Sequence, residues 1–151
     1  MLSQHLRGRW YTRAVAPRIS YVVGRLDRVL RRALGDALAP HGLSLPEYTT
    51  LSVLSARSGL SNAQLARRSL ITPQAMNEVL ARLEERRLVR RRPDPAHRRV
   101  RPAELTAAGK RALTAADRAV DAVERTMLGD VSAAERRQLG QLLAKALRGF
   151  E

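Results

Sequence analysis

The chain contains no cysteine, and only 3% of its 151 residues are aromatic. The absence of cysteine excludes disulfides, zinc sites with cysteine ligands and thiol redox sensing. Because aromatics are scarce while 44% of the residues are hydrophobic, the apolar content is chiefly Leu, Val and Ala, which favours a helical core over a β-sandwich. The length fits one domain.

Long apolar runs are also missing. No stretch approaches the roughly 20 apolar residues that a membrane helix needs, and the N-terminus lacks the apolar run of a signal peptide. We therefore expect a cytoplasmic protein with no membrane role.

Groups that could support catalysis are scattered. His5, His41 and His97 fall in separate segments, and no Ser/His/Asp set, glycine-rich phosphate loop or metal-ligand spacing accompanies them. We expect no metal, no cofactor and no enzymatic activity.

Positive charge is what the chain has in excess. The formal net charge is +14, and residues 82–101 hold nine arginines against three acidic residues. Clustered positive charge favours a polyanionic partner, because each neutralised phosphate releases counterions. A nucleic acid is the leading partner.

Apolar residues recur at helical spacing and predict several amphipathic helices. The first runs from about Pro17 to Leu38, where the sequence Pro40-His41-Gly42 ends it. Capping boxes, in which a Ser and a Glu or Gln three residues later satisfy backbone N–H groups, begin at Ser44, Ser61 and Ser132.

Two short helices joined by a turn match a helix-turn-helix motif. The first opens at Ser61 and stops near Ser69. The second has Thr72 as its cap and Pro73 at its first position, where the missing N–H of proline costs nothing. Its inward side is expected to consist of Met76, Val79, Leu80 and Leu83.

Helical periodicity ends after Glu85, and residues 88–105 predict a two-stranded hairpin with prolines in its turn. Thr106 then caps a helix that runs to about Leu128, and the last helix carries an apolar stripe ending at Phe150. The predicted fold class is mostly α with a small β-hairpin wing: a winged helix-turn-helix with N- and C-terminal dimerisation helices.

The helices at the two ends are longer than a small DNA-binding module needs. We expect a single domain in which residues 1–13 are a basic arm, 14–39 and 107–151 are dimerisation helices, and 44–106 are the DNA-binding lobe. The terminal stripes could pair within one chain or with a second copy. A second copy is favoured, because a dimeric helix-turn-helix matches two DNA half-sites one helical turn apart.

Six short motifs stand in a fixed order between Leu43 and Ala112. They are Leu45-Pro46-Glu47-Tyr48, Leu60–Ala66, Thr72-Pro73-Gln74-Ala75-Met76-Asn77, Leu83–Val89, Arg92–Ala96 and Leu105–Lys110. Together they resemble the MarR family of winged-helix transcriptional regulators. The resemblance implies a homodimer whose first and last helices intertwine, a pseudo-palindromic double-stranded DNA operator, and repression that a small-molecule effector relieves. The alternative is a nucleic-acid-binding or architectural protein without sequence specificity.

Two positions depart from the family's pattern. His97 stands where an aspartate commonly holds the minor-groove arginine two positions later, and a histidine cannot offer Arg99 the bidentate contact of a carboxylate. Arg87 replaces the glycine that is usual before Leu88, so it is strained if that position needs a positive φ.

The candidate DNA contacts lie on the second helix of the motif and on the wing. Gln74 and Asn77 can hydrogen-bond adenine edges, and Ala75 can contact a thymine methyl. Glu78 could accept a hydrogen bond from cytosine, or pair with Arg82 at i,i+4 spacing, which is favoured. Arginines beside the groove are assigned to phosphate, and Arg99 to the minor groove. The full set is Ser61, Thr72, Pro73, Gln74, Ala75, Asn77, Glu78, Arg82, Arg86, Arg90, Arg91, Arg92, His97, Arg98 and Arg99.

The residues that could line an effector cavity are less clearly indicated than the DNA contacts. Trp10, Tyr21 and Tyr48 could line one between the dimerisation helices and the DNA-binding lobe, although aromatic residues at helical spacing belong more often to the core.

Overall fold

The computed structural model describes residues 17–91 and 102–150, and these form a mostly helical winged helix-turn-helix, as the sequence predicts. The elements of this part of the chain, besides short 3₁₀ turns at Ala39–His41 and Arg148–Phe150, are α1 (Ile19–Leu38), α2 (Leu45–Ala56), α3 (Asn62–Arg68), α4 (Pro73–Glu85), β1 (Val89–Arg91), β2 (Ala103–Leu105), α5 (Ala107–Met127) and α6 (Ala133–Leu147).

Helices α2 to α6 all begin at the caps that the sequence predicts. The Ser44 hydroxyl accepts from the Glu47 N–H, and the Glu47 carboxylate accepts from the Ser44 N–H at 2.8 Å. The boxes at Ser61 and Ser132 have the same reciprocal geometry. Thr72 and Thr106 cap α4 and α5 by accepting from the N–H three residues later.

The hairpin leans on the helices through one face. β1 and β2 pair antiparallel, with Val89 opposite Leu105 and Arg91 opposite Ala103. Val89 and Ala103 are almost fully buried, which joins the base of the wing to the core. The turn of the hairpin lies outside the described residues.

One core holds α2, α3 and α4 together with the end of α1 and the first half of α5. From the two long helices, Leu38, Leu113 and Ala116 enter this core. The predicted boundary of the lobe at residue 106 therefore falls inside one packed unit.

Helix α2 occupies the centre of the lobe and is buried on more sides than the sequence indicates. Leu51 and Leu54 are buried, whereas Tyr48 and Val53 pack only partly against the core. Thr50 is also fully buried, which its polar side chain did not signal.

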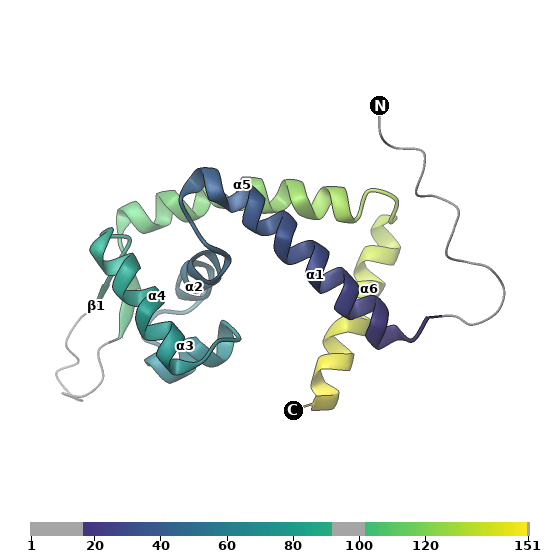
Figure 1. Cartoon of the computed structure of the whole chain (residues 1–151), viewed down its shortest axis with the longest axis horizontal. Helices are drawn as coiled ribbons and strands as arrows, with labels where there is room; N and C mark the ends of the chain where they lie inside the picture. The colour runs from purple at the N-terminus through teal and green to yellow at the C-terminus, as the bar shows by residue number, and fades with distance from the viewer. Residues whose placement is uncertain (1–16, 92–101, 151) are drawn as a thin grey trace.

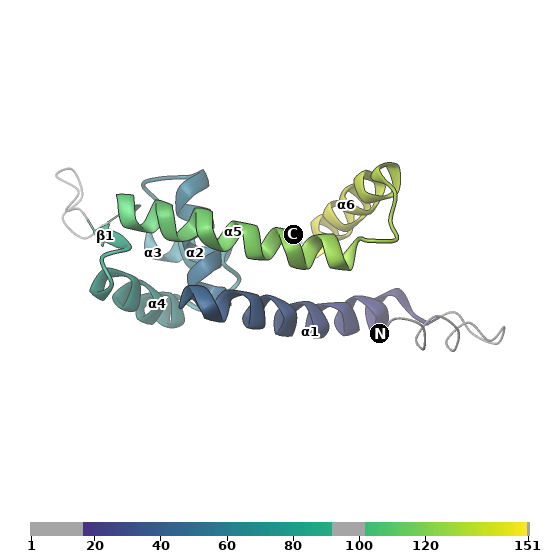
Figure 2. The same ribbon diagram turned by 90° about the horizontal axis from the view of Figure 1, so that it is seen from above.

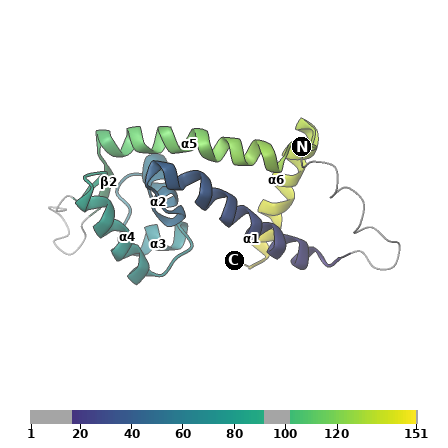
Figure 3. The same cartoon turned by 45° about the horizontal axis from the view of Figure 1, so that its top comes forward.

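Helices α1 and α5 leave the lobe together, running in opposite directions, and α6 follows at the far end of α5 (Figure 1). Seen from above, α6 stands apart from α1, on the other side of α5 (Figure 2). The intermediate view shows α1 and α5 spreading apart as they extend away from the lobe (Figure 3). Helix α6 buries none of its side chains, so the stripes on the terminal helices do not form a bundle within one chain.

The large apolar side chains exposed on α1, α6 and the C-terminal turn after α6 are Ile19, Val22, Val23, Leu26, Val29, Leu139, Leu142, Leu143, Leu147 and Phe150. Within residues 17–91 and 102–150, no helix has the combination of length and apolar content that spanning a membrane requires.

Candidate nucleic-acid interface

Helix α4 presents a polar face to solvent. Gln74, Asn77 and Glu78 are exposed at its start, and Ala75 beside them is partly exposed. The opposite face is buried through Met76, Val79, Leu80 and Leu83, as the sequence predicts. The capping residue Thr72 and the following Pro73 are also exposed, while Ser61 is half-exposed at the start of α3. The amide side chains are therefore free to meet a groove surface.

Asn62 joins the starts of the two helices in the motif. Its side-chain Nδ2 donates to the Pro73 carbonyl at 3.1 Å, across the crossing of α3 and α4. The bond fixes the first turn of α4 relative to α3. No sequence pattern indicates this role, because the contact exists only once the two helices cross.

A buried carboxylate engages two arginines at the other end of α4. Glu47 Oε1 lies 3.4 Å from Arg82 Nε, and Glu47 Oε2 lies 3.8 Å from Arg86 Nη1. The Glu47 side chain is 8% exposed, whereas those of Arg82 and Arg86 are 52% and 39% exposed. Both guanidinium groups can therefore meet Glu47 and still reach solvent.

The prediction of an ion pair between Glu78 and Arg82 is wrong, because no ion pair within the described residues includes Glu78. Arg82 turns instead toward Glu47 on α2, because a desolvated carboxylate attracts a guanidinium more strongly than an exposed one does. Glu78 stays on the outward face beside Asn77.

The arginines of β1 also face carboxylates. Arg90 Nη2 lies 3.3 Å from Glu104 Oε2 on the neighbouring strand, and Arg91 Nε lies 3.0 Å from Glu84 Oε2. The second contact is an ion pair without hydrogen-bond alignment. These pairs set the direction of both side chains at the base of the wing. Arg92, His97, Arg98 and Arg99 lie outside the described residues.

The base of the wing is packed tightly against the start of α5. The Thr106 hydroxyl lies 2.7 Å from the Arg87 carbonyl, to which it donates, and the Thr106 N–H donates to the Leu88 carbonyl at 3.1 Å. A Cβ added at Gly109 would lie 2.0 Å from the Leu88 oxygen, so only glycine permits this approach. Arg87 has a φ of 56°, which confirms the strain expected if this position required a positive φ.

The three aromatic residues considered for an effector cavity do not come together among the described residues. Tyr21 is 64% exposed on α1, and Trp10 lies outside the described part. Tyr48 is half-buried, and its hydroxyl donates to Asp117 on α5 at 2.9 Å. Burial, with the nearby Asp117 next in importance, raises the pKa of Tyr48 to about 12.

A hollow of about 210 Å³ lies instead between α1, the start of α2 and the turn before α4. Leu34, Leu45 and Ile71 contribute apolar walls. The polar groups come from Arg68, Ser69 and the ion pair of Arg31 with Asp27. Ser69 is only 7% exposed, and its hydroxyl has no hydrogen-bond partner among the residues that the structure describes.

Comparison with known proteins places this geometry in a family. A sequence model of the MarR family matches residues 41–100. The HTH-type transcriptional repressor Rv2887 of Mycobacterium tuberculosis is 39% identical over 127 residues, which are 84% of this chain and 91% of the relative. The transcriptional regulator HosA of Escherichia coli is 35% identical over 105 residues, covering 70% of this chain and 78% of that protein.

Solved structures of MarR-family proteins also match this chain. The structure of Rv2887 in complex with DNA matches with a TM-score of 0.72 at 39% identity, covering 87% of this chain and 98% of that one. Rv2887 has also been crystallised with p-aminosalicylic acid, and that structure matches with a TM-score of 0.72 at 40% identity, covering 87% of this chain and 98% of that one. With this identity, coverage and shared winged helix-turn-helix, the chain belongs to the MarR family.

Proposed function

We propose that this protein is a sequence-specific DNA-binding transcriptional regulator, a repressor that acts as a homodimer without catalysis or a cofactor. The proposal rests on the exposed side chains of Gln74 and Asn77 at the capped start of α4. Asn62 holds this end of the helix in place. Amides at this place in a helix-turn-helix can form paired hydrogen bonds with adenine edges. The complex of Rv2887 with DNA supports the same use of the fold.

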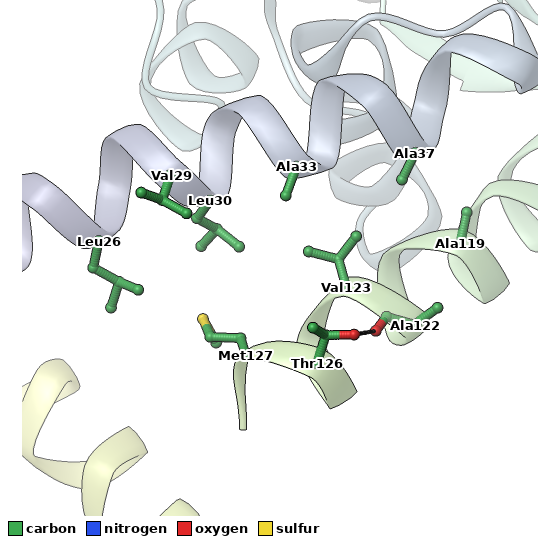
Figure 4. A pocket seen from close by; sticks show the side chains of 10 residues that line it. All are labelled: Leu26, Val29, Leu30, Ala33, Ala37, Ala119, Ala122, Val123, Thr126 and Met127. Atoms are coloured by element: carbon green, nitrogen blue, oxygen red, sulfur yellow. Dashed lines mark hydrogen bonds between the residues drawn. The ribbon is translucent and has the colours of Figure 1, made fainter. Parts of the chain in front are cut away.

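A second copy of the chain would cover the apolar faces of α1 and α6 that are exposed in a single chain. Between α1 and α5 runs an open groove of about 600 Å³, into which Leu26, Leu30, Val123 and Met127 point (Figure 4). The stripe of α6 buries nothing in its own chain, and its leucines have the chemistry that such a groove accepts. We assign α6 of a second copy to this groove, in an isologous dimer.

The division of the chain follows from this assignment. Residues 14–39 and 107–151 would form the dimer, and residues 44–106 the DNA-binding lobe, with the first half of α5 shared between the two. The basic arm of residues 1–13 lies outside the described residues.

Base reading is tested on a duplex selected for tight binding, with an unrelated duplex as the comparison. Gln74→Ala and Asn77→Ala should each cost about 1–3 kcal/mol on the selected duplex and little on the unrelated one. Arg91→Ala should weaken binding to both and flatten the slope of log affinity against log salt by roughly one unit. Equal losses on both duplexes for the two amide variants would favour the alternative, a protein that binds nucleic acid without reading sequence.

The proposed effector is a small aromatic carboxylate, since Rv2887 has been crystallised with salicylic acid and p-aminosalicylic acid. The hollow beside Ser69 suits this chemistry, because it combines apolar walls with an unpartnered hydroxyl and the guanidinium of Arg68.

Titration calorimetry with salicylate tests this site. Ser69→Ala should weaken salicylate binding, whereas Thr114→Ala, which removes a hydroxyl from α5 outside the hollow, should not. Unchanged affinity in Ser69→Ala together with Arg68→Ala would place the effector elsewhere.

A further inference from the structure

Besides the packing of Leu113 and Ala116 in the core, specific contacts join the DNA-binding lobe to α5 at two separate points. The first is the start of the helix, where Gly109 lies against the Leu88 carbonyl and Thr106 bonds to the same strand junction. The second is Asp117, which accepts the Tyr48 hydroxyl from α2 at 2.9 Å. Gly109 and Asp117 are eight positions apart, which is about 12 Å along a helix.

The second attachment lies where α5 leaves the lobe. Leu113 and Ala116, before it, are buried in the core of the lobe. Beyond it, Ala119, Val123 and Met127 line the groove between α5 and α1. One half of α5 thus belongs to the lobe, and the other half to the surface proposed to hold the second copy.

A helix held by a contact at one point can still pivot about that point, whereas contacts at two points fix the direction of its axis. The bond between Tyr48 and Asp117 joins segments 69 residues apart in the sequence and is partly shielded from water. The phenol is protonated and able to donate throughout the neutral range, and burial raises the pKa of Tyr48 further above that range, to about 12.

We infer that the hydrogen bond between Tyr48 and Asp117 fixes the angle between the DNA-binding lobe and α5, and thereby sets the spacing of DNA half-sites that the protein accepts. Both residues are positioning residues and touch no DNA. The inference rests on the proposed function, because only a dimer that reads two half-sites has a spacing to set. Half-sites one helical turn apart require recognition helices about 34–36 Å apart, so a change in this angle alters the match.

The experiment compares three duplexes that share the selected half-sites, with the selected spacing or with one base pair inserted or removed between them. Wild-type protein should bind the selected spacing most tightly. Tyr48→Phe, which deletes only the hydroxyl, should lower that preference about threefold to tenfold, the scale of one partly buried hydrogen bond. Ser55→Ala, which deletes an exposed hydroxyl from the same helix α2, is the matched control and should keep the full preference.

Variants of the acceptor separate positioning from general stability. Asp117→Asn keeps an oxygen that accepts the phenol proton, so it should retain the spacing preference. Asp117→Ala should resemble Tyr48→Phe, and the double variant should lose no more than either single variant. Binding to a duplex with one half-site should be the same for all of these proteins.

Full spacing preference in Tyr48→Phe would overturn the inference, as would an equal loss on all three duplexes. If wild-type protein selected no duplex at all, the proposed function itself would fail, and that result is distinct from a wild-type preference that the variants leave unchanged.

Discussion

Arg87 occupies a conformation that suits glycine, with a φ of 56° directly before the buried Leu88. A Cβ in this region costs about 1–2 kcal/mol, whereas glycine adds about 0.4–1 kcal/mol of freedom to the unfolded chain. Arg87→Gly should therefore raise the free energy of unfolding by about 0.5–1 kcal/mol.

Urea denaturation at fixed protein concentration measures this effect. Arg87→Ala is the control, since it removes the charge but keeps the Cβ, and it should bring no comparable gain. A lower midpoint for Arg87→Gly would show that the guanidinium contributes more than the strain costs.

Tyr48 gives a prediction about pH. Its pKa in the folded protein is about 12, against an ordinary value of 10.0, so its contribution to stability is complete below pH 10 and is lost as the pH rises toward 12. The difference in phenolate absorbance between wild-type protein and Tyr48→Phe should therefore show a step near pH 12. Asp117→Asn should move that step down, because a negative charge that opposes ionisation is removed. A step near pH 10 in the wild type would mean that Tyr48 is solvated.

At the scale of elements, the contact of α5 with the base of the wing depends on one glycine. Gly109→Ala places a Cβ against the Leu88 carbonyl, which cannot move without shifting β1, and we expect a loss of about 1–3 kcal/mol in the free energy of unfolding. Gly35→Ala is the matched control on α1, since a Cβ there meets nothing within 4 Å and should add about 0.5–1 kcal/mol. Equal effects in thermal unfolding would contradict the close approach.

Sequence patterns predicted most of the elements because their signals are local. Each cap from Ser44 to Ser132 lies within four residues of the group it satisfies, and the apolar face of α4 follows from helical spacing alone. The exposed amides Gln74 and Asn77 follow from the same spacing.

Contacts between elements were not predictable in this way. Glu47 was assigned only to a capping box, yet in the fold it also faces Arg82 on α4 and Arg86 directly after that helix. Asn62 and Tyr48 likewise have partners 11 and 69 residues away. Such contacts depend on how the helices cross, which no periodicity in a single sequence specifies.

At the scale of the whole molecule, the apolar stripe of α6 is the feature that a single chain leaves unexplained. Leu142 is 56% exposed, and in the proposed dimer it would lie against the second copy. Leu142→Glu should therefore yield monomers that bind the selected duplex much more weakly, because the dimer contact would bury an unpaired charge. Gln141→Glu adds the same charge one residue away, off the stripe, and should remain dimeric. Light scattering at micromolar concentration measures the mass of each protein in solution. A wild-type protein with the mass of one chain would contradict the proposed dimer.

The central claim is that two copies of α4 read two related half-sites on DNA. Selecting bound sequences from a pool of random duplexes tests it most directly. The account predicts a pseudo-palindromic consensus whose half-sites are centred about one helical turn, roughly 10–10.5 base pairs, apart. A consensus without symmetry, or bound DNA with no consensus at all, would contradict it.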